Sequence, residues 1–594
     1  MSEPLIIKLD DLGNTNRVSI DDIIEIAENH RKIEISDSIK DIICDQREKL
    51  DRQMEKYPEI KIYGTNSLHG DLKDVNVSQK MLKKYQRKYI KVHNCGTGDP
   101  LPPKVVRALM AIRLISLVKG FSGMRWETIE LLRDMLNHDL IPVVLEEGSV
   151  GASGDLVPLA MVAAAMINLP EARVYLNEKW DTGNNADKNC EIISGYTTVS
   201  AGYGFKKSGL KPVELEAKEA MGLTNGTNFM ASIMIFAIRD LENVLKHASI
   251  SGALALEAIR GEKDAFSEII CNNRPHRGQV EIAKQIRRLI DGSRRMSPDS
   301  QKQLFNIKSN DQHDKPEVRV QDRYSFRAIP QVHGVAYEAI EKAKDVLTVE
   351  INSVTDNPLF KEVPVVKMQS VVPNVIYRKL IENNEKTLIK AYSGANFHGQ
   401  PLASIIDYVK TAVASLGLIS DRRSFSLLDK KQSYGLPSNL AYDMAEADGG
   451  LMLLQYAGAA RAAENKVLAS PSSVTSVPTS ANQEDFVSMG ANGAIHLRKM
   501  VHNMQVIIAV EMICALRALQ LTDGAKWLPS HLQKLGAGNK KIYDFLSSHN
   551  RFAKGDAEDE NKYLRDHYLR TDLIGMVELL ESGRLLDEVG FVFE

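Results

Sequence analysis

The tripeptide Ala152-Ser153-Gly154 is the segment of this chain with the least ordinary chemistry. Gly154 has no side chain, so its backbone nitrogen can approach the Ala152 carbonyl closely enough to attack it. Ring closure and loss of water, including the Ser153 hydroxyl, would leave a five-membered ring that carries an exocyclic methylidene group. Such a ring is an electrophile, and it would supply chemistry that no ordinary side chain offers.

Two common catalytic motifs are excluded at this place. A nucleophile elbow requires Gly-x-Ser-x-Gly, but Asp155 occupies the position of the last glycine. A phosphate-binding loop would need Gly-Lys-Ser/Thr or Gly-x-Gly-x-x-Gly, and neither occurs in this stretch. Because Ala-Ser-Gly is also found in plain loops, its interpretation depends on the rest of the chain.

Composition and charge describe a large globular protein. The chain has 594 residues, of which 43% are hydrophobic and 26% are charged, and its formal net charge is −2. A nearly neutral chain gives no electrostatic reason to expect a nucleic acid as a partner. The five cysteines are few and unpaired in their spacing, which is typical of free thiols in a reducing, cytoplasmic compartment.

Membrane insertion is not expected either. The N-terminus lacks the basic and apolar regions of a signal peptide. The longest apolar run, residues 156–169, is shorter than the roughly 20 residues that span a bilayer. We interpret it as a buried core helix that begins directly after the tripeptide.

The elements that must position these residues are mainly helical. From about residue 230 the apolar spacing is persistently helical, and helices of roughly 20 residues or more predict a bundle. Strand signals are scarce and fall at residues 60–63, 174–176 and 365–367. We therefore expect a mainly α fold in three parts: a loop-rich N-terminal portion (1–230), a central helical bundle (231–530) and a charged helical tail (531–594).

Six further segments carry unusual combinations of polar groups. They are Tyr63-Gly64-Thr65-Asn66, Val92-His93-Asn94-Cys95-Gly96-Thr97-Gly98, Thr224-Asn225-Gly226-Thr227, Gln321-Asp322-Arg323-Tyr324-Ser325-Phe326-Arg327, Gly394-Ala395-Asn396-Phe397-His398 and Gln483-Glu484-Asp485-Phe486-Val487-Ser488-Met489-Gly490. Together with the tripeptide, and in the same order from about residue 60 to about 520, they resemble the aromatic amino acid ammonia-lyase family.

The resemblance implies an enzyme that removes ammonia from an α-amino acid and releases the trans-α,β-unsaturated acid. It implies a fumarase/aspartase-like bundle of long helices, and a homotetramer in which several chains contribute to each site. It also implies that Ala152, Ser153 and Gly154 fuse into 4-methylidene-imidazol-5-one, which acts as the electron sink. We accordingly expect no metal, nucleotide or pyridoxal requirement, and no His/Cys/Asp cluster has ligand spacing.

Roles follow for the residues that match the family's motifs. Tyr63 would be the base that removes the β-proton, although a phenol with a pKa near 10 must first be deprotonated. Asn225 and Tyr324 would line and polarise the cyclic cofactor, and Phe397 would pack near it. Gln321 and Arg327 would bind the substrate, and Arg327 would hold its carboxylate with the guanidinium fork.

Each of these residues also has an ordinary structural interpretation. Tyr63 could be a core tyrosine, Asn225 with its following glycine a plain turn, and Arg327 a surface ion pair. The combination of motifs favours the catalytic interpretation, because a scaffold protein would not need all of them together.

Two positions bear on the substrate. His93 falls where the family meets the far edge of the substrate ring, and phenylalanine-type members tend to have an apolar residue there. Glu484 stands where histidine-type members have Glu and tyrosine- and phenylalanine-type members commonly have Gln. Both residues favour L-histidine, which would give trans-urocanate, since polar pocket groups discriminate against rings that lack a matching group.

The chain also departs from the family pattern. Ser67-Leu68-His69-Gly70 stands where Thr-Gly-Phe-Gly is usual, next to the expected base. Phe486 replaces a histidine that histidine-type members have, and Asn94 replaces a small residue. These departures leave open a tyrosine ammonia-lyase or an aromatic amino acid 2,3-aminomutase. A non-catalytic helical scaffold is the alternative from another class.

Overall fold

The computed structural model describes residues 3–152, 154–177, 180, 190–303, 319–523, 528–549, 551–555, 559 and 561–594. The chain forms two compact units whose segments alternate along the sequence. Unit 1 contains Met1–Phe236, Lys344–Ile406 and Pro471–Ile495, and unit 2 contains Ala237–Ala343, Asp407–Ser470 and His496–Glu594. The expected three-part division at residues 230 and 530 divides the chain by position along the sequence, whereas the two units are defined by contacts in space. The three-part division stays a prediction.

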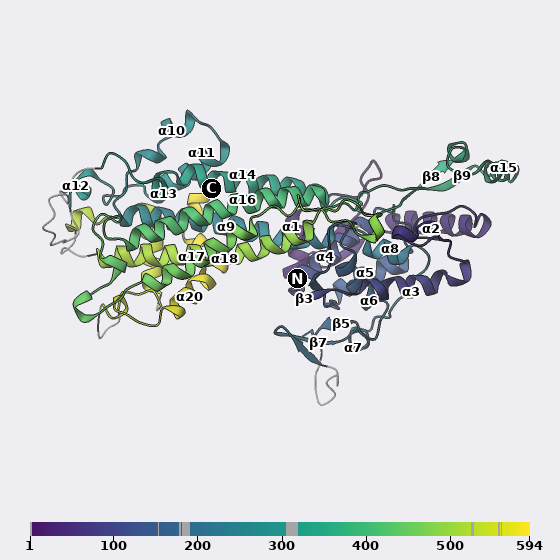
Figure 1. Ribbon diagram of the computed structural model, residues 1–594, viewed down its shortest axis with the longest axis horizontal. Coiled ribbons are helices and arrows are strands. Elements are labelled where there is room, and N and C mark those ends of the chain that lie inside the picture. Colours follow the sequence, from purple (N-terminus) through teal and green to yellow (C-terminus); the bar gives the residue numbers. More distant parts are fainter. Residues whose placement is uncertain are drawn as a thin grey trace. The chain divides into compact units, whose positions relative to one another are not determined.

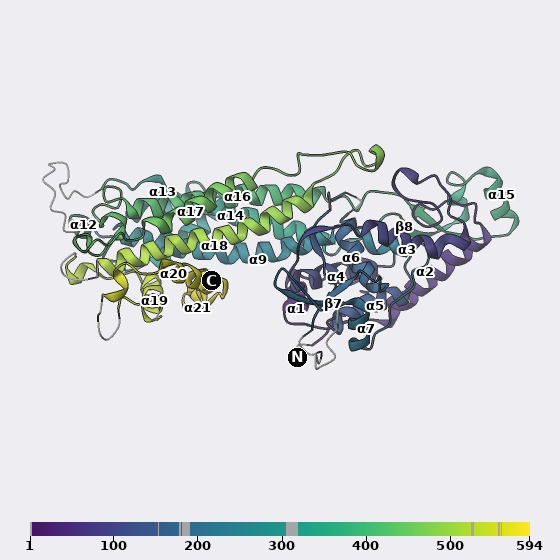
Figure 2. The same cartoon turned by 60° about the horizontal axis from the view of Figure 1, so that its bottom comes forward.

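Long helices dominate the structure (Figure 1). Four of them contain the unit boundaries, and these are α9 (Asn228–Ala258), α14 (Ile329–Glu350), α16 (Gln400–Leu428) and α18 (Gly490–Leu521). Within unit 2 they run side by side with α17 (Met452–Leu468) in the views of Figures 1 and 2. The mainly α, long-helix prediction is confirmed.

The remaining helices of unit 2 are shorter. They are α10 (Glu268–Asn272), α11 (Arg277–Leu289), α12 (Pro298–Gln301), α13 (Tyr324–Arg327), α19 (Ala537–Ser548), α20 (Leu569–Glu581), α21 (Arg584–Glu588) and α22 (Gly590–Phe593). A buried ion pair links two bundle helices, because the Arg423 guanidinium of α16 donates to the Glu511 carboxylate of α18 and both side chains are inaccessible. Breaking such a pair from one side is costly, so it fixes the relative register of the two helices.

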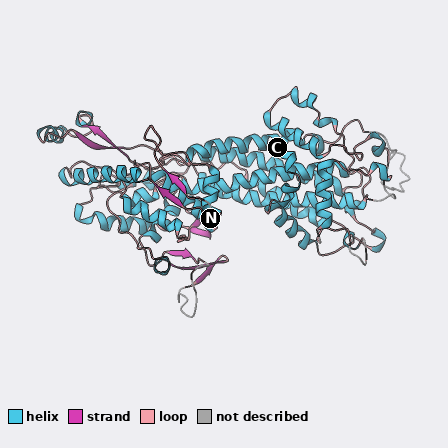
Figure 3. Ribbon diagram, turned by 180° about the vertical axis from the view of Figure 1, so that it is seen from behind, coloured by secondary structure: helices cyan, strands magenta, loops and turns pink. Residues whose placement is uncertain are grey.

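Unit 1 combines short helices with all the strands of the described residues (Figure 3). Its helices are α1 (Ile20–Glu28), α2 (Asp37–Lys56), α3 (Leu82–His93), α4 (Pro103–Leu117), α5 (Trp126–Asn137), α6 (Leu156–Met166), α7 (Ala201–Ser208), α8 (Glu219–Thr224) and α15 (Asn374–Glu382). The apolar residues of α4 and α6 are almost all buried, which makes these two helices the centre of the unit's core.

The sheets of unit 1 are small. β1 (Leu5–Ile7) pairs in parallel with β2 (Ile33–Ile35), and β3 (Thr97–Pro100) pairs antiparallel with β4 (Leu145–Glu147). A three-stranded antiparallel sheet has the order β5 (Arg173–Tyr175), β7 (Tyr196–Ser200), β6 (Glu191–Ile193), and β8 (Leu359–Pro364) forms a hairpin with β9 (Thr387–Tyr392).

Three local expectations can be compared with the structure. The expected strand at residues 174–176 is present as β5, shifted by one residue. The run at 365–367 is instead a 3-10 turn, Val365–Met368. β8 ends where its partner β9 begins, since Pro364 pairs with Thr387, and the Val365 amide still donates to the Lys386 carbonyl at 3.0 Å before the chain turns. Residues 60–63 form a loop that leads into a turn, not a strand.

The apolar helices are core helices of the fold. The run that begins at Leu156 forms α6 directly after the tripeptide, as expected, and its side chains from Pro158 to Met166 are buried. Among the described residues, α16 and α18 are long and apolar enough to cross a membrane, but 72% and 94% of their apolar windows are buried inside the protein.

Candidate active site

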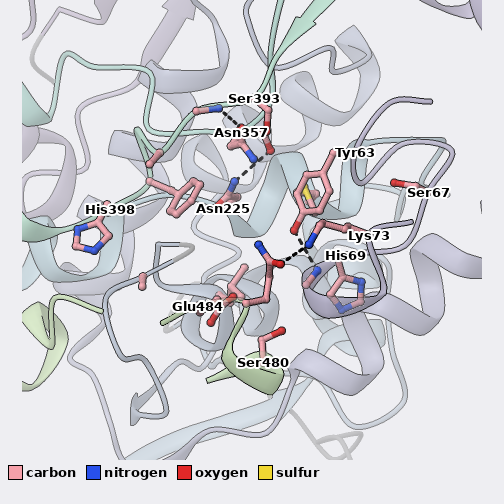
Figure 4. A pocket seen from close by; sticks show the side chains of 18 of the residues that line it. Tyr63, Ser67, His69, Lys73, Asn225, Asn357, Ser393, His398, Ser480 and Glu484 are labelled. Atoms are coloured by element: carbon pink, nitrogen blue, oxygen red, sulfur yellow. Dashed lines mark hydrogen bonds between the residues drawn. The ribbon is translucent and has the colours of Figure 1, made fainter. Parts of the chain in front are cut away.

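A cavity of about 720 Å³ in unit 1 gathers most of the predicted site residues (Figure 4). Segments far apart in the sequence form its wall: the stretch from Lys61 to Asp74, the end of α3, the start of α6, α8 with the residue that follows it, residues 357 and 393–398, and residues 480–486. Six of the predicted residues line it, and these are Tyr63, His93, Ala152, Asn225, Phe397 and Glu484.

The backbone around the tripeptide is packed very tightly. Ser153 lies outside the described residues, but Ala152 lines the cavity and Gly154 is paired with Gly226 in a short β-bridge. A Cβ built on Gly154 would lie 2.2 Å from the Gly226 nitrogen, and the φ of Gly154 is +69°. Only glycine fits this position, since any side chain would collide with backbone atoms.

Asp155 anchors the end of the tripeptide. Its carboxylate accepts hydrogen bonds from the Ser149 hydroxyl at 2.7 Å and from the backbone amides of Phe229 and Met230, each at 3.1 Å. Its own amide donates to the Gly226 carbonyl at 2.7 Å. Burial raises the pKa of Asp155 to about 7, against the opposite effect of these hydrogen bonds.

The other end of the loop is held by distant segments of unit 1. The Gly151 carbonyl accepts hydrogen bonds from the Ser488 hydroxyl at 2.7 Å and from the Gly399 amide at 3.0 Å. The Met489 amide donates to the Val150 carbonyl at 2.8 Å. Hydrogen bonds therefore hold the chain at Val150 and Gly151 on one side of the tripeptide and at Asp155 on the other.

Asn225 presents an unsatisfied oxygen beside this loop. Its amide nitrogen donates to the Asp356 carboxylate at 3.3 Å and to the Asn357 carbonyl at 3.2 Å. Its Oδ1 is buried and has no hydrogen-bond partner among the described residues. Because an unpaired buried oxygen is costly, this atom is available for a group that the chain itself does not provide.

Buried charges behind Asn225 hold it in this orientation. The Lys218 ammonium donates to the second oxygen of Asp356 at 2.9 Å, and neither side chain is accessible to solvent. The buried Arg113 guanidinium donates to the Asn225 carbonyl at 2.7 Å. Burial lowers the pKa of Lys218, and Asp356 opposes that shift.

Tyr63 points into the cavity and bonds its own loop. Its hydroxyl oxygen accepts a hydrogen bond from the Gly70 amide at 3.1 Å. Burial raises the pKa of Tyr63, the Glu484 carboxylate raises it further, and the Gly70 amide lowers it. A neutral phenol is thus the resting form, and only the Gly70 contact favours the phenolate.

His93 and Glu484 line the cavity from two segments that are far apart in the sequence, the end of α3 and the stretch 480–486. His93 Nδ1 lies 2.8 Å from the Tyr89 carbonyl oxygen, and burial lowers the pKa of the imidazole. The Glu484 carboxylate accepts a hydrogen bond from the Thr479 hydroxyl at 2.6 Å. Glu484 also acts electrostatically on both His93 and Tyr63, so these three side chains form one electrostatic group.

The sequence reasoning missed several residues of the cavity wall. His398 lines it, and its ring stacks on Phe486 with centroids 5.9 Å apart. Lys73 lines it and donates from its ammonium to the Gln483 side chain. Asn357 was visible only as part of the Asp-Asn-Pro breaker, and no motif signalled that its carbonyl would meet Asn225.

Three predicted residues are in unit 2 and do not line this cavity. Gln321 precedes α13, and Tyr324 and Arg327 are the ends of that helix. The Arg327 guanidinium lies 4.7 Å from the centre of the Tyr324 ring, and Tyr324 is 75% exposed. Arg327 Nε has no hydrogen-bond partner in the described part of the chain.

No group of three or more His, Cys, Asp or Glu side chains that could hold a metal ion occurs in the described part of the chain. All five cysteines are free thiols.

Comparisons with known proteins agree with the geometry. The family model for aromatic amino acid lyases matches residues 18–548. A histidine ammonia-lyase of Caldanaerobacter subterraneus subsp. tengcongensis is 34% identical over 582 residues, covering 98% of each chain. One of Deinococcus radiodurans is 36% identical, covering 96% of this chain and 93% of the relative.

Solved structures of the same kind superimpose over the whole chain. A histidine ammonia-lyase from Trypanosoma cruzi has a TM-score of 0.75 at 28% identity and covers 100% of this chain and 96% of its own. A tyrosine aminomutase from Streptomyces globisporus has a TM-score of 0.78 at 26% identity, with 100% and 99% covered. The chain belongs to the aromatic amino acid lyase family, and it is a carbon–nitrogen lyase with the fumarase/aspartase-like helical fold.

Proposed function

We propose that this enzyme eliminates ammonia from L-histidine to give trans-urocanate. The observation that carries the proposal is the placement of His93 and Glu484 in one cavity with Tyr63, the residue that matches the family's base. The relatives that are 34% and 36% identical bear the name histidine ammonia-lyase, which supports the same substrate.

The residues around the tripeptide fit a cyclised cofactor. Gly154 approaches Gly226 so closely that no side chain fits, and the buried Asn225 Oδ1 is left without a partner. We infer that Ala152, Ser153 and Gly154 form 4-methylidene-imidazol-5-one, which when formed supplies an electrophile that withdraws electrons from the substrate. The hydrogen bonds at Gly151 and Asp155 fix the chain on either side of the tripeptide, which would favour ring closure.

Tyr63 would take the β-proton at its hydroxyl oxygen. The phenol must first lose its own proton, and the Gly70 amide is the one direct contact in unit 1 seen to stabilise the resulting charge. His93 and Glu484 would orient the substrate ring, and Phe397 would pack against the reacting end. Tyr63 would thus remove the proton, while His93 and Glu484, on other segments of the same cavity, would recognise the ring.

The carboxylate end of the substrate would be held by residues of another copy of the chain. Arg327 offers a guanidinium nitrogen without a partner, and the neighbouring Tyr324 is exposed on unit 2. We infer a homotetramer in which Gln321, Tyr324 and Arg327 of one copy complete the cavity of another. We further infer a cytoplasmic enzyme with an amino acid substrate and no metal, nucleotide, nucleic-acid or membrane partner, consistent with its five free thiols.

A direct comparison of products tests the substrate assignment. The same preparation is given L-histidine, L-tyrosine and L-phenylalanine, and urocanate, coumarate and cinnamate are measured by absorbance. We expect histidine to be preferred, because an unsubstituted ring offers His93 and Glu484 no hydrogen bond, and each polar contact that the substrate fails to make costs roughly 1–3 kcal/mol. Glu484→Gln should weaken histidine turnover more than tyrosine turnover, by roughly tenfold.

Faster coumarate formation would move the assignment to the tyrosine ammonia-lyases. A β-amino acid among the products would move it to the aminomutases, a class to which the Streptomyces globisporus structure belongs by name.

A further inference from the structure

Three rings in the wall of the cavity, those of His69, Tyr89 and His93, form a cluster with the ring of Tyr85. The ring of His69 meets Tyr89 edge-on with centroids 4.5 Å apart and lies 4.9 Å from His93. The rings of Tyr89 and His93 stack at 3.9 Å. His69, Tyr89 and His93 line the cavity, so His69 stands next to the residue expected to meet the substrate ring.

His93 presents a hydrogen-bond acceptor to the cavity. Its Nδ1 lies 2.8 Å from the Tyr89 carbonyl oxygen, which can only accept, so Nδ1 must carry the hydrogen. Burial lowers the pKa of His93, so the ring is neutral near neutral pH and Nε2 keeps its lone pair. Glu484 is also an acceptor when ionised, which gives the cavity two acceptors for the ring.

A neutral imidazole needs a donor as well. It carries one N–H, which either acceptor can bind, and one nitrogen lone pair, which neither can. A polar group left unpaired in a buried site weakens binding of the ring that carries it. The wall that recognises histidine should therefore contain a hydrogen-bond donor beside His93.

His69 can supply that donor. Its Nδ1 lies 2.8 Å from the Tyr85 hydroxyl, and burial lowers the pKa of His69 to about 4, so the ring is neutral and carries one hydrogen. If the Tyr85 hydroxyl donates to Nδ1, the hydrogen must be on Nε2. Nε2 has no hydrogen-bond partner within the described residues, and the side chain lines the cavity.

We propose that His69 is a specificity-determining residue, which donates from Nε2 to the lone-pair nitrogen of the substrate's imidazole while His93 or Glu484 accepts from the ring N–H. The proposal rests on the proposed function. It gives a physical role to the histidine that stands where the family usually has phenylalanine. The ring of phenylalanine offers no hydrogen-bonding group to His69 or His93, and the single hydroxyl of tyrosine offers fewer such groups than an imidazole.

The test compares His69→Phe with His69→Gln. Phenylalanine keeps the ring that packs on Tyr89 and His93 but removes the donor, whereas the Gln amide nitrogen can reach a position similar to that of Nε2. The readout is the ratio of kcat/KM for L-histidine to kcat/KM for L-tyrosine, because the fraction of active enzyme cancels in this ratio. We expect His69→Phe to lower the ratio about tenfold and His69→Gln to lower it less.

Tyr85→Phe is a second, milder variant. It leaves His69 in place but removes the hydroxyl that bonds Nδ1, so the hydrogen can move between the two ring nitrogens. We expect the ratio to fall by less than in His69→Phe, and the intact mass of all three variants to show the same loss of water as the wild type.

The possible outcomes separate the two proposals. If wild type prefers histidine but His69→Phe leaves the ratio unchanged, the role of His69 is overturned and the proposed function stands. An equal fall in the Phe and Gln variants would also overturn it, since it would indicate packing rather than donation. If wild type forms no urocanate, the proposed function itself fails, and the role of His69 fails with it.

Discussion

The cavity of unit 1 and the α13 segment of unit 2 hold their polar side chains in opposite ways. In the cavity, Tyr63, His93 and Glu484 each bond a group of the same unit. On α13, Tyr324 is 75% exposed, and Arg327 Nε has no hydrogen-bond partner among the described residues. A large exposed aromatic beside an arginine with a free nitrogen is unusual enough to need an explanation.

Under the proposed function, each region is half of a site, and different copies of the chain supply the two halves. The cavity residues would then orient the substrate ring and remove a proton, and both tasks need fixed orientation. The α13 segment differs, because Tyr324 is exposed and the buried Arg327 Nε has no hydrogen-bond partner among the described residues. Three predictions break or sharpen this comparison.

The largest effect is expected at the tripeptide itself. Ser153→Ala removes the hydroxyl whose loss creates the methylidene group, so turnover should fall by at least about a thousandfold. Intact mass should lie about two waters below the sequence mass in wild type and only about one water or none below it in the variant. The far-UV spectrum and thermal midpoint should stay close to wild type, since the clamps on Gly151 and Asp155 do not involve Ser153. An unshifted mass in active wild-type enzyme would rule out the cyclised cofactor.

The second-largest effect tests whether different copies of the chain supply the cavity and the α13 segment of each site. Tyr63→Phe damages the cavity and Arg327→Met damages α13, so each variant alone should be nearly inactive. If different copies supply the two halves, dissociating and reassembling the two variants together should restore some activity through sites with both halves intact. Reassembling each variant with itself is the control.

If oligomers that are verified to contain both variants recover no activity, one chain supplies both halves of the site. A fully active monomer in light scattering would also contradict a composite site.

Local sequence patterns predicted the long helices and six of the residues that line the cavity, but they did not predict which distant segments meet. The long helices were visible because α9 and α18 repeat apolar residues over many turns. The meeting of Asn225 with Asp356 was not visible, because 131 residues separate the partners and nothing in either segment encodes the contact. The same holds for Gly151 and Ser488, which are 337 residues apart.

Local errors have local physical reasons. The apolar run at 365–367 was expected as a strand, but the partner strand β9 begins at Thr387, opposite Pro364, so no strand remains to pair with the run and the chain turns. Residues 531–594 were expected to be a charged helical tail, yet the described residues between Phe552 and α20 contain only the 3-10 turn Lys562–Leu564. The stretches 181–189 and 311–315, whose polar composition favours exposure to solvent, lie outside the described residues.

The smallest effect is a shift in pH dependence that links ring recognition to proton removal. Burial raises the pKa of Tyr63, and the negative charge of Glu484 raises it further. Below the pKa of an essential base, kcat/KM rises about tenfold per pH unit as the phenolate forms. Glu484→Gln removes a charge that opposes phenolate formation, so the pKa of Tyr63 should fall and the rise in kcat/KM should move to lower pH.

The substrate for this measurement should be L-tyrosine, because turnover of histidine would also be weakened by the loss of a contact to its ring. Thr479→Val is a suitable control, since it removes only the hydroxyl that bonds Glu484 and keeps the carboxylate charge. A shift of the Glu484→Gln profile to higher pH would mean that Glu484 does not act on Tyr63 through its charge, and the cavity could not then be treated as one electrostatic group.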